Sequence, residues 1–332
     1  MARLHKEFTN YNKAIKLDPS KKEGLLKTRR ELRRKIKRWF RENYPDQLQP
    51  KFASQGSMEM DTAINPIAVY DDKQEKYIYA YDLDDGIYFI EVDGENNRLG
   101  ISTWHDRVFN AVDGHTTVPS QKKDTCVRVL FKDGHNIDLP IYYKSGDIIE
   151  LAHKSKGWIL SDPKEFYEWF NKLKNSQLER IVRYLKGWKN YRELNNSSLA
   201  LPSGFELTIL AANNYIENEF DDTSFLETLR KILTELEEEF KCLRPTTPKE
   251  EDVFANYSDT RRDGFLTALR SLIKDLERAS EEKNFKKASE ILRSNQFGDR
   301  FPLGADKDED DKSSGLGVTL GAATIKPKPY GR

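Results

Sequence analysis

The sequence has few of the residues that mark cross-linked, metal-binding or membrane-embedded proteins. Its 332 residues include two cysteines, Cys126 and Cys242, and five histidines without a zinc-ligand spacing. We therefore expect free thiols in a reducing cytoplasm. No apolar run approaches the roughly 20 residues that a membrane-spanning helix needs, and the first residues lack the apolar stretch of a secretory signal. The sequence thus predicts a cytoplasmic protein that does not contact a membrane.

An excess of charge of one sign is also absent. Lys plus Arg and Asp plus Glu each number 55, so the formal net charge is zero. This balance argues against recruitment of nucleic acid by bulk charge, although a local basic face could still attract an anion. The 17 Phe, 15 Tyr and 5 Trp exclude wholesale disorder, and the length suffices for two domains.

Apolar periodicity predicts one long helix near the beginning of the chain. In residues 21–44, Leu25, Leu32, Ile36 and Phe40 recur at helical spacing and form one apolar stripe. The opposite face carries many Lys and Arg residues. That face is either solvated or part of a basic groove for an anionic ligand.

The rest of the chain changes character twice. Residues 51–160 are rich in Tyr, Ile and Val and predict a mostly antiparallel sheet, with a hairpin turn at "KDG" between 125–131 and 135–143. From Asp162, an N-cap candidate followed by proline, the pattern is that of amphipathic helices. After Phe301 the apolar content falls, which is typical of a flexible tail.

The predicted fold class is therefore α+β. We expect an N-terminal long helix and a mixed, mostly antiparallel sheet packed against a C-terminal helical domain. The predicted units are a catalytic core at 1–162, a helical domain at 163–302 that closes the active-site cleft, and a flexible tail at 303–332. A ligand cleft between the first two units is the natural expectation.

Three acidic residues have positions typical of a metal site. Asp82 and Asp84 are two residues apart in a predicted strand, so both side chains face the same way. Asp138 stands in a second predicted strand between two apolar residues, where an unpaired carboxylate is costly. Together they predict a site for two Mg²⁺ ions, with Mn²⁺ as a possible substitute. The alternatives are a plain turn at Asp84-Asp85-Gly86 and a strand-edge acid at Asp138.

A Gly-Ser pair in "QGSMEMDTAINP" is weak evidence for a phosphate site until the acids are added. Gly56-Ser57, then Asp82-x-Asp84, then Asp138 resembles the pattern of the DNA polymerase β-like nucleotidyltransferases. Five segments resemble the bacterial CD-NTases, the cGAS/DncV-like enzymes that make cyclic di- and trinucleotide signals in anti-phage defence. These segments are "YDLDDGIYF", "IDLPIYY", "GWILSDPKEFYEWF", "RYLKGWKN" and "LPSGFELTILA". The resemblance covers roughly residues 20–300 and is closest to the bacterial cyclic GMP-AMP synthases.

The resemblance implies a role for each candidate residue. Asp82, Asp84 and Asp138 would be the catalytic metal ligands, and Gly56 and Ser57 would hold the triphosphate of the donor nucleotide. Lys186 would reach the β- and γ-phosphates, and Ser203 would add a phosphate contact. Gln55 is expected to orient the Gly-Ser turn, and Met60 stands where relatives often place an aromatic that stacks on a base. Without the resemblance, Lys186 fits a solvated lysine, Ser203 a helix N-cap and Met60 a core residue.

By the same resemblance, we expect a cyclic di- or trinucleotide synthase of the cyclic GMP-AMP-like kind that uses ATP, GTP or both with Mg²⁺. It would act in CBASS anti-phage defence, with accessory proteins and an effector that responds to the product. The chain lacks the His/Cys cluster of animal cGAS, so activation by double-stranded DNA is not expected. The alternatives are a linear nucleotidyltransferase for RNA, protein or a small molecule, and an inactive nucleotide-binding module. The tail is either a site of covalent attachment to targets or without a role.

Overall fold

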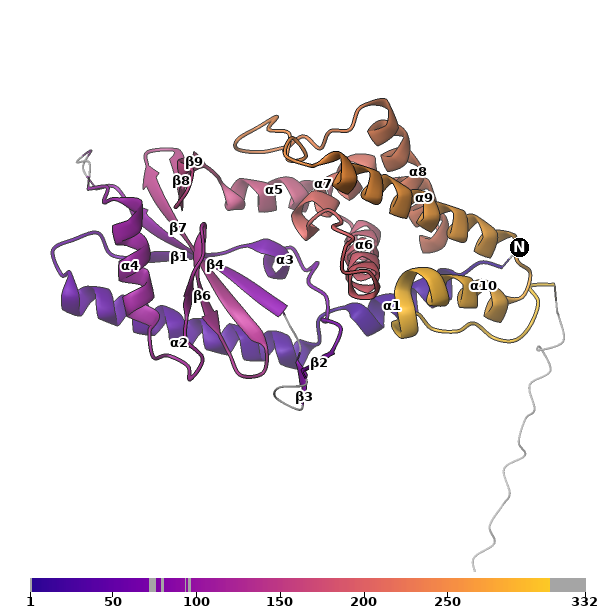
Figure 1. Cartoon of the computed structure of the whole chain (residues 1–332), viewed down its shortest axis with the longest axis horizontal. Helices are drawn as coiled ribbons and strands as arrows, with labels where there is room; N and C mark the ends of the chain where they lie inside the picture. Colours follow the sequence, from indigo (N-terminus) through magenta and orange to yellow (C-terminus); the bar gives the residue numbers. More distant parts are fainter. Residues whose placement is uncertain (1, 72–75, 79–80, 93, 95–96, 311–332) are drawn as a thin grey trace, which may run out of the picture.

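A computed structural model describes residues 2–71, 76–78, 81–92, 94 and 97–310. The sheet forms one half of the molecule, with α2 and α4 beside its strands, and a helical half stands next to it (Figure 1). Most of the predicted tail lies outside the described residues. No helix in the described ranges is long and apolar enough to span a membrane. Both cysteines are buried and unpaired.

The predicted long helix is confirmed as α2 (Pro19–Asn43). The Asp18 side chain accepts a hydrogen bond from the backbone N–H of Ser20 at 2.8 Å, and Pro19 starts the helix. The expected apolar stripe is buried against the sheet, with Leu32, Ile36 and Phe40 wholly inaccessible to solvent. A shorter helix that the sequence analysis did not predict, α1 (His5–Ile15), precedes it.

The main sheet is mixed and mostly antiparallel, as predicted. Its strands run in the order β1-β4-β7-β6-β5, while β8 pairs with the end of β7 and β9 pairs with β8. These strands are β1 (Lys51–Ser54), β4 (Tyr81–Ile90), β5 (Gln121–Lys122), β6 (Cys126–Leu130), β7 (His135–Ser145), β8 (Ile148–His153) and β9 (Gly157–Leu160). A separate hairpin pairs β2 (Val69–Asp71) with β3 (Lys76–Ile78). Among the described pairings, only β4 and β7 run parallel.

The helical half follows the sheet, as predicted. It contains α5 (Pro163–Leu173), α6 (Ser176–Asn195), α7 (Gly204–Asn214), α8 (Asp221–Glu238), α9 (Asp259–Glu281) and α10 (Phe285–Leu292), then a π-helical turn (Arg293–Phe297) and a 3-10 turn (Gly298–Arg300). Asp162 caps α5 by accepting hydrogen bonds from two backbone N–H groups, which confirms the predicted cap. Within the stretch expected to form a mostly antiparallel sheet, the structure also has two helices that were not predicted, α4 (Ile101–Val112) and the single turn α3 (Gly56–Glu59).

Two hydrophobic cores correspond to the two halves. One lies between the sheet and α2 and α4, and the other lies among the helices from α5 onward. Phe8, Tyr11 and Ile15 of α1 belong to the helical core, although the sequence placed residues 1–162 in a single unit. The predicted domain boundaries remain a prediction, but the first helix packs with the second half.

Candidate active site

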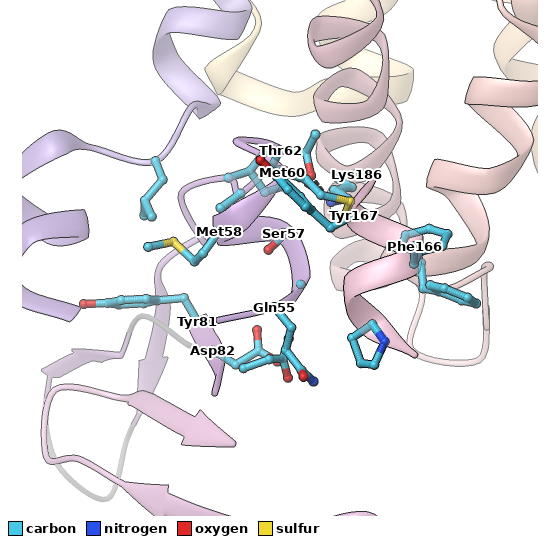
Figure 2. Close-up of a pocket in the computed structure, with 18 of the residues that line it drawn as sticks. Gln55, Ser57, Met58, Met60, Thr62, Tyr81, Asp82, Phe166, Tyr167 and Lys186 are labelled. Atoms are coloured by element: carbon cyan, nitrogen blue, oxygen red, sulfur yellow. Dashed lines mark hydrogen bonds between the residues drawn. The ribbon is translucent and has the colours of Figure 1, made fainter. Parts of the chain in front are cut away.

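A pocket of about 540 Å³ lies between the sheet half and the helical half. Figure 2 shows Ser57 near its centre, with Met58 and Tyr81 on one side and Phe166 on the other. The residues of the sequence prediction that line it are Gln55, Gly56, Ser57, Met60, Asp82, Asp84 and Lys186. Asp138 and Ser203 do not line it. The cleft expected between the two halves is therefore present.

The Gly-Ser turn is built into the first turn of α3, directly after β1. Gly56 has a φ of +73°, in the left-handed region that favours glycine. A Cβ at this position would collide with Oδ2 of Asp84. Gln55 donates a hydrogen bond from Nε2 to the Tyr142 hydroxyl at 3.2 Å. The turn thus holds its backbone against an acidic residue of β4, and only glycine fits there.

Asp82 and Asp84 lie on the same side of β4, as the alternation of side chains predicted. Both side chains line the pocket, where Asp82 is exposed to solvent and Asp84 is half-buried. Burial, together with the like charges of Asp82 and Asp138, raises the pKa of Asp84 to about 7. Burial and Asp138 also raise the pKa of Asp82. A cation placed between these carboxylates would relieve the repulsion.

The alternative of a turn at Asp84-Asp85-Gly86 is wrong, because all three residues belong to β4. Asp85 points to the opposite side of the strand and is fully buried. There it accepts hydrogen bonds from Nε (2.8 Å) and Nη2 of Arg33, on the basic helix α2. This ion pair was not predicted from the sequence. Part of the basic face of α2 therefore neutralises a buried acid.

Asp138 is opposite Asp84 across the parallel β4–β7 pair. Its two carboxylate oxygens accept hydrogen bonds from Nε and Nη2 of Arg128, each at 2.7 Å, so it is paired rather than a lone strand-edge acid. Among the described residues, no group of three or more His, Cys, Asp or Glu side chains is arranged to hold a metal ion. Asp82 and Asp84 nevertheless supply the oxygen donors that Mg²⁺ prefers, and their repulsion fits a divalent cation.

Lys186 faces the acids from α6. It is 8% exposed, so the alternative of a solvated lysine is wrong. Its Nζ donates hydrogen bonds to Oγ1 of Thr62 at 3.0 Å and to the Thr62 carbonyl at 3.3 Å. Burial and the nearby charge of Arg183 lower the pKa of Lys186 to about 7, while Asp82 and Asp84 oppose that shift.

Ser203 and Met60 have structural roles beside the pocket. Ser203 is the N-cap of α7, and its side chain forms a reciprocal capping box with Glu206. The next residue, Gly204, lines the pocket and lies against the Lys186 side chain. Met60 is 5% exposed and packs into the helical core while it also lines the pocket. Their proposed contacts with phosphate and base remain predictions.

Several pocket residues were missed by sequence reasoning. They are Met58, Thr62, Tyr81, Tyr142, Phe166, Tyr167, Phe205 and Arg244. Aromatic residues in a strand or an amphipathic helix look like core residues in a sequence, so no local signal identified them as pocket residues. Thr62 carried no signal at all, because its contacts are with Ser57 and a helix more than 100 residues away.

Comparison with known proteins gives a family match within the sheet half. Residues 50–142 match the family described as "Cyclic GMP-AMP synthase DncV-like, nucleotidyltransferase domain". This range contains the Gly-Ser turn and all three acids. The match confirms the resemblance to the CD-NTases that the sequence motifs indicated.

Two curated relatives are both named cyclic GMP-AMP synthase. The protein from Escherichia albertii is 26% identical over 252 residues, which cover 70% of this chain and 54% of that protein. The protein from Escherichia coli (strain TW11681) is 25% identical over 249 residues, which cover 58% of this chain and 54% of that protein. The chain therefore spans about half the length of the curated relatives that it matches.

Solved structures of the Vibrio cholerae DncV cyclic AMP-GMP synthase share the fold. The complex with nonhydrolyzable GTP superposes with a TM-score of 0.73 at 19% identity, and covers 92% of this chain and 100% of that chain. The complex with the linear intermediate 5′ pppA(3′,5′)pG gives a TM-score of 0.74 at 19% identity, and covers 91% of this chain and 99% of that chain. The likeness extends over both halves of the molecule.

Proposed function

We propose that this chain, whose residues 50–142 match the DncV-like nucleotidyltransferase domain family, is a cyclic dinucleotide synthase that joins two NTPs. One observation carries the proposal. Two carboxylates of β4 lie in the pocket beside the Gly56-Ser57 turn, and a buried lysine faces them from α6. Nucleotidyl transfer requires these parts: acidic residues, a backbone turn that can bind phosphate, and a positively charged side chain.

Each part has a distinct task in the proposed reaction. The Gly56-Ser57 turn offers backbone N–H groups and a hydroxyl to the triphosphate, and Lys186 adds positive charge at the β- and γ-phosphates. Asp82 and Asp84, with Asp138 behind them, would hold Mg²⁺ or Mn²⁺. A bound divalent cation would neutralise charge on the phosphates and lower the pKa of the attacking hydroxyl. Pocket walls from both halves hold the two nucleotides in reach of each other.

The identity of the substrates is inferred from the relatives. The curated relatives are named cyclic GMP-AMP synthase, and the DncV structures contain a nonhydrolyzable GTP and a linear pppApG intermediate. We therefore propose ATP and GTP as substrates and a cyclic GMP-AMP-like product. By the same reasoning, the product would be a second messenger in CBASS defence, acting on an effector in the cytoplasm.

The proposal is tested by incubating the protein with ATP, GTP and MgCl₂ and resolving the products by mass spectrometry. A cyclic product resists phosphatase because it has no terminal phosphate. We expect the double substitution Asp82→Asn and Asp84→Asn to lower its formation at least 1000-fold, or about 4 kcal/mol of transition-state stabilisation. Asp263→Asn, at an exposed position on α9, is the matched control.

The outcomes separate the rival functions. Unchanged product formation in the Asp82/Asp84 variant would reject the site. A phosphatase-sensitive product would favour a linear nucleotidyltransferase. Nucleotide binding without turnover, in Mg²⁺ and in Mn²⁺, would indicate an inactive binding module.

A further inference from the structure

Two consecutive backbone carbonyl groups after α3 accept hydrogen bonds from side chains on one face of α6. Arg183 donates from Nη1 to the carbonyl of Asp61 at 2.5 Å, and Lys186 donates from Nζ to the carbonyl of Thr62 at 3.3 Å. The two donors are three residues apart, so they lie on the same side of the helix. This contact joins the segment that leaves the Gly-Ser turn to the helical half. Figure 2 shows Thr62 beside Lys186 above Ser57.

Thr62 is one of the residues through which the segment after α3 contacts the helical half. It has no exposed surface, and its backbone N–H donates to the Ser57 carbonyl at 2.9 Å. Its hydroxyl accepts from Lys186 at 3.0 Å. The preceding residue, Asp61, has a φ of +54°, a costly conformation for a residue other than glycine. Such a conformation persists only where surrounding contacts hold it, and here Arg183 holds the carbonyl of Asp61.

Within the part of the chain that the structure describes, Lys186 has hydrogen-bond partners for two of its three N–H donors. A charged lysine has three N–H donors and no acceptor. Two of the Lys186 donors are directed to Thr62, one to its hydroxyl and one to its carbonyl. Because Thr62 is itself bonded to Ser57, the third donor is held at a fixed position relative to the Gly-Ser turn. The proposed triphosphate would lie at this turn.

We propose that Thr62 is a positioning residue: its hydroxyl and carbonyl hold the Lys186 ammonium so that the remaining N–H is directed to the phosphates of the bound nucleotide. The inference rests on the proposed function, since it assumes a triphosphate at the Gly-Ser turn. Thr62 is not among the site residues that were predicted from the sequence. Thr62 does not touch the reacting atoms and acts through Lys186.

The hydroxyl also helps to keep Lys186 charged. Burial disfavours the ammonium and brings the pKa of Lys186 to about 7. A hydrogen bond accepted from the charged form raises the pKa, so removing the acceptor lowers it further. Lys186 of a Thr62→Val variant would lose its proton at a lower pH than Lys186 of the wild type.

The test compares Thr62→Val, which keeps the shape and removes the hydroxyl, with Thr62→Ser, which keeps the hydroxyl. Binding of nonhydrolysable ATP and GTP analogues and of AMP is measured by calorimetry with Mg²⁺. Losing a hydrogen bond to a charged group predicts about tenfold weaker binding of the triphosphates to Thr62→Val. AMP, which lacks the β- and γ-phosphates, should change less than twofold. Thr62→Ser should bind like the wild type.

The control is Thr228→Val on α8. Thr228 is also wholly buried and its hydroxyl accepts one backbone hydrogen bond, from Ile216 at 3.1 Å, but it does not line the pocket. This variant should bind every nucleotide like the wild type. Should Thr62→Val fail to fold, Thr62→Ala removes the same hydroxyl and carries the same test.

The pH dependence of triphosphate binding gives a second readout, which would not change if Thr62 had a purely structural role. The contribution of Lys186 to triphosphate affinity should decline as the pH rises above about 7, because Lys186 loses its charge. Arg183, Asp82 and Asp84 act on Lys186 in both proteins, and the pKa of Asp84 is also about 7, so the profile of the variant is compared with that of the wild type. In Thr62→Val the decline should begin about one pH unit lower. Equal losses for ATP and AMP, or an unshifted pH profile, would overturn the inference. Wild-type protein that binds no triphosphate would reject the proposed function as well.

Discussion

Gly56→Ala is a small change with a large predicted effect. Two costs arise from the structure. Gly56 has a φ of +73°, and a left-handed conformation costs an alanine about 1–2 kcal/mol. The added Cβ would also collide with Oδ2 of Asp84, which would have to leave its rotamer at a cost of about 0.5–1.5 kcal/mol. The expected loss of unfolding free energy is therefore about 1.5–3.5 kcal/mol.

Gly114→Ala separates the two costs. Gly114 has a φ of +63°, and no atom lies within 4 Å of a Cβ built there. This control should lose only the conformational part, about 1–2 kcal/mol. Urea unfolding followed by tryptophan fluorescence measures both variants.

The effect of Gly56→Ala on product formation should be larger than its effect on stability. A shift of about 1 Å in a reacting group can cost about 100-fold in rate, and Asp84 must move to admit the Cβ. We expect a loss of that size for Gly56→Ala and none for Gly114→Ala. Equal stability losses in the two variants, with normal activity in both, would refute the close approach of the Gly-Ser turn to Asp84.

Two further predictions concern the sheet half. Arg33→Met leaves Asp85 buried without its partner and should lower the unfolding free energy by about 3–5 kcal/mol in urea denaturation, and a loss below 1 kcal/mol would contradict a buried ion pair. His105 is fully buried, and burial lowers its pKa, so the unfolded chain takes up its proton first. Stability that His105 contributes above about pH 6.5 should therefore be lost as the pH falls. His105→Gln should flatten the decline of the urea midpoint between pH 7.5 and 5.5; an identical slope in both proteins would show that His105 does not contribute.

Much of the fold could be predicted because its signals are local. The stripe of α2, the cap at Asp162 and the strand pair around "KDG" each depend on residues within a few positions of each other. α4 was missed although Trp104, Val108 and Val112 recur at helical spacing, since the strand-rich composition around it dominated the interpretation. The packing of α1 into the helical half had no local signal.

For the site, the sequence by itself determined which chemistry was available. Asp82 and Asp84 share a face because side chains alternate along any strand, and the Gly-Ser pair supplies a turn that tolerates a positive φ. Only the tertiary structure decided the partners. The parallel β4–β7 pairing places Asp138 opposite Asp84, and Arg128 donates a hydrogen bond to Asp138. Thr62 accepts a hydrogen bond from Lys186, which is 124 positions away in the sequence. Contacts of that kind depend on how whole elements pack, and no periodicity within one element encodes them.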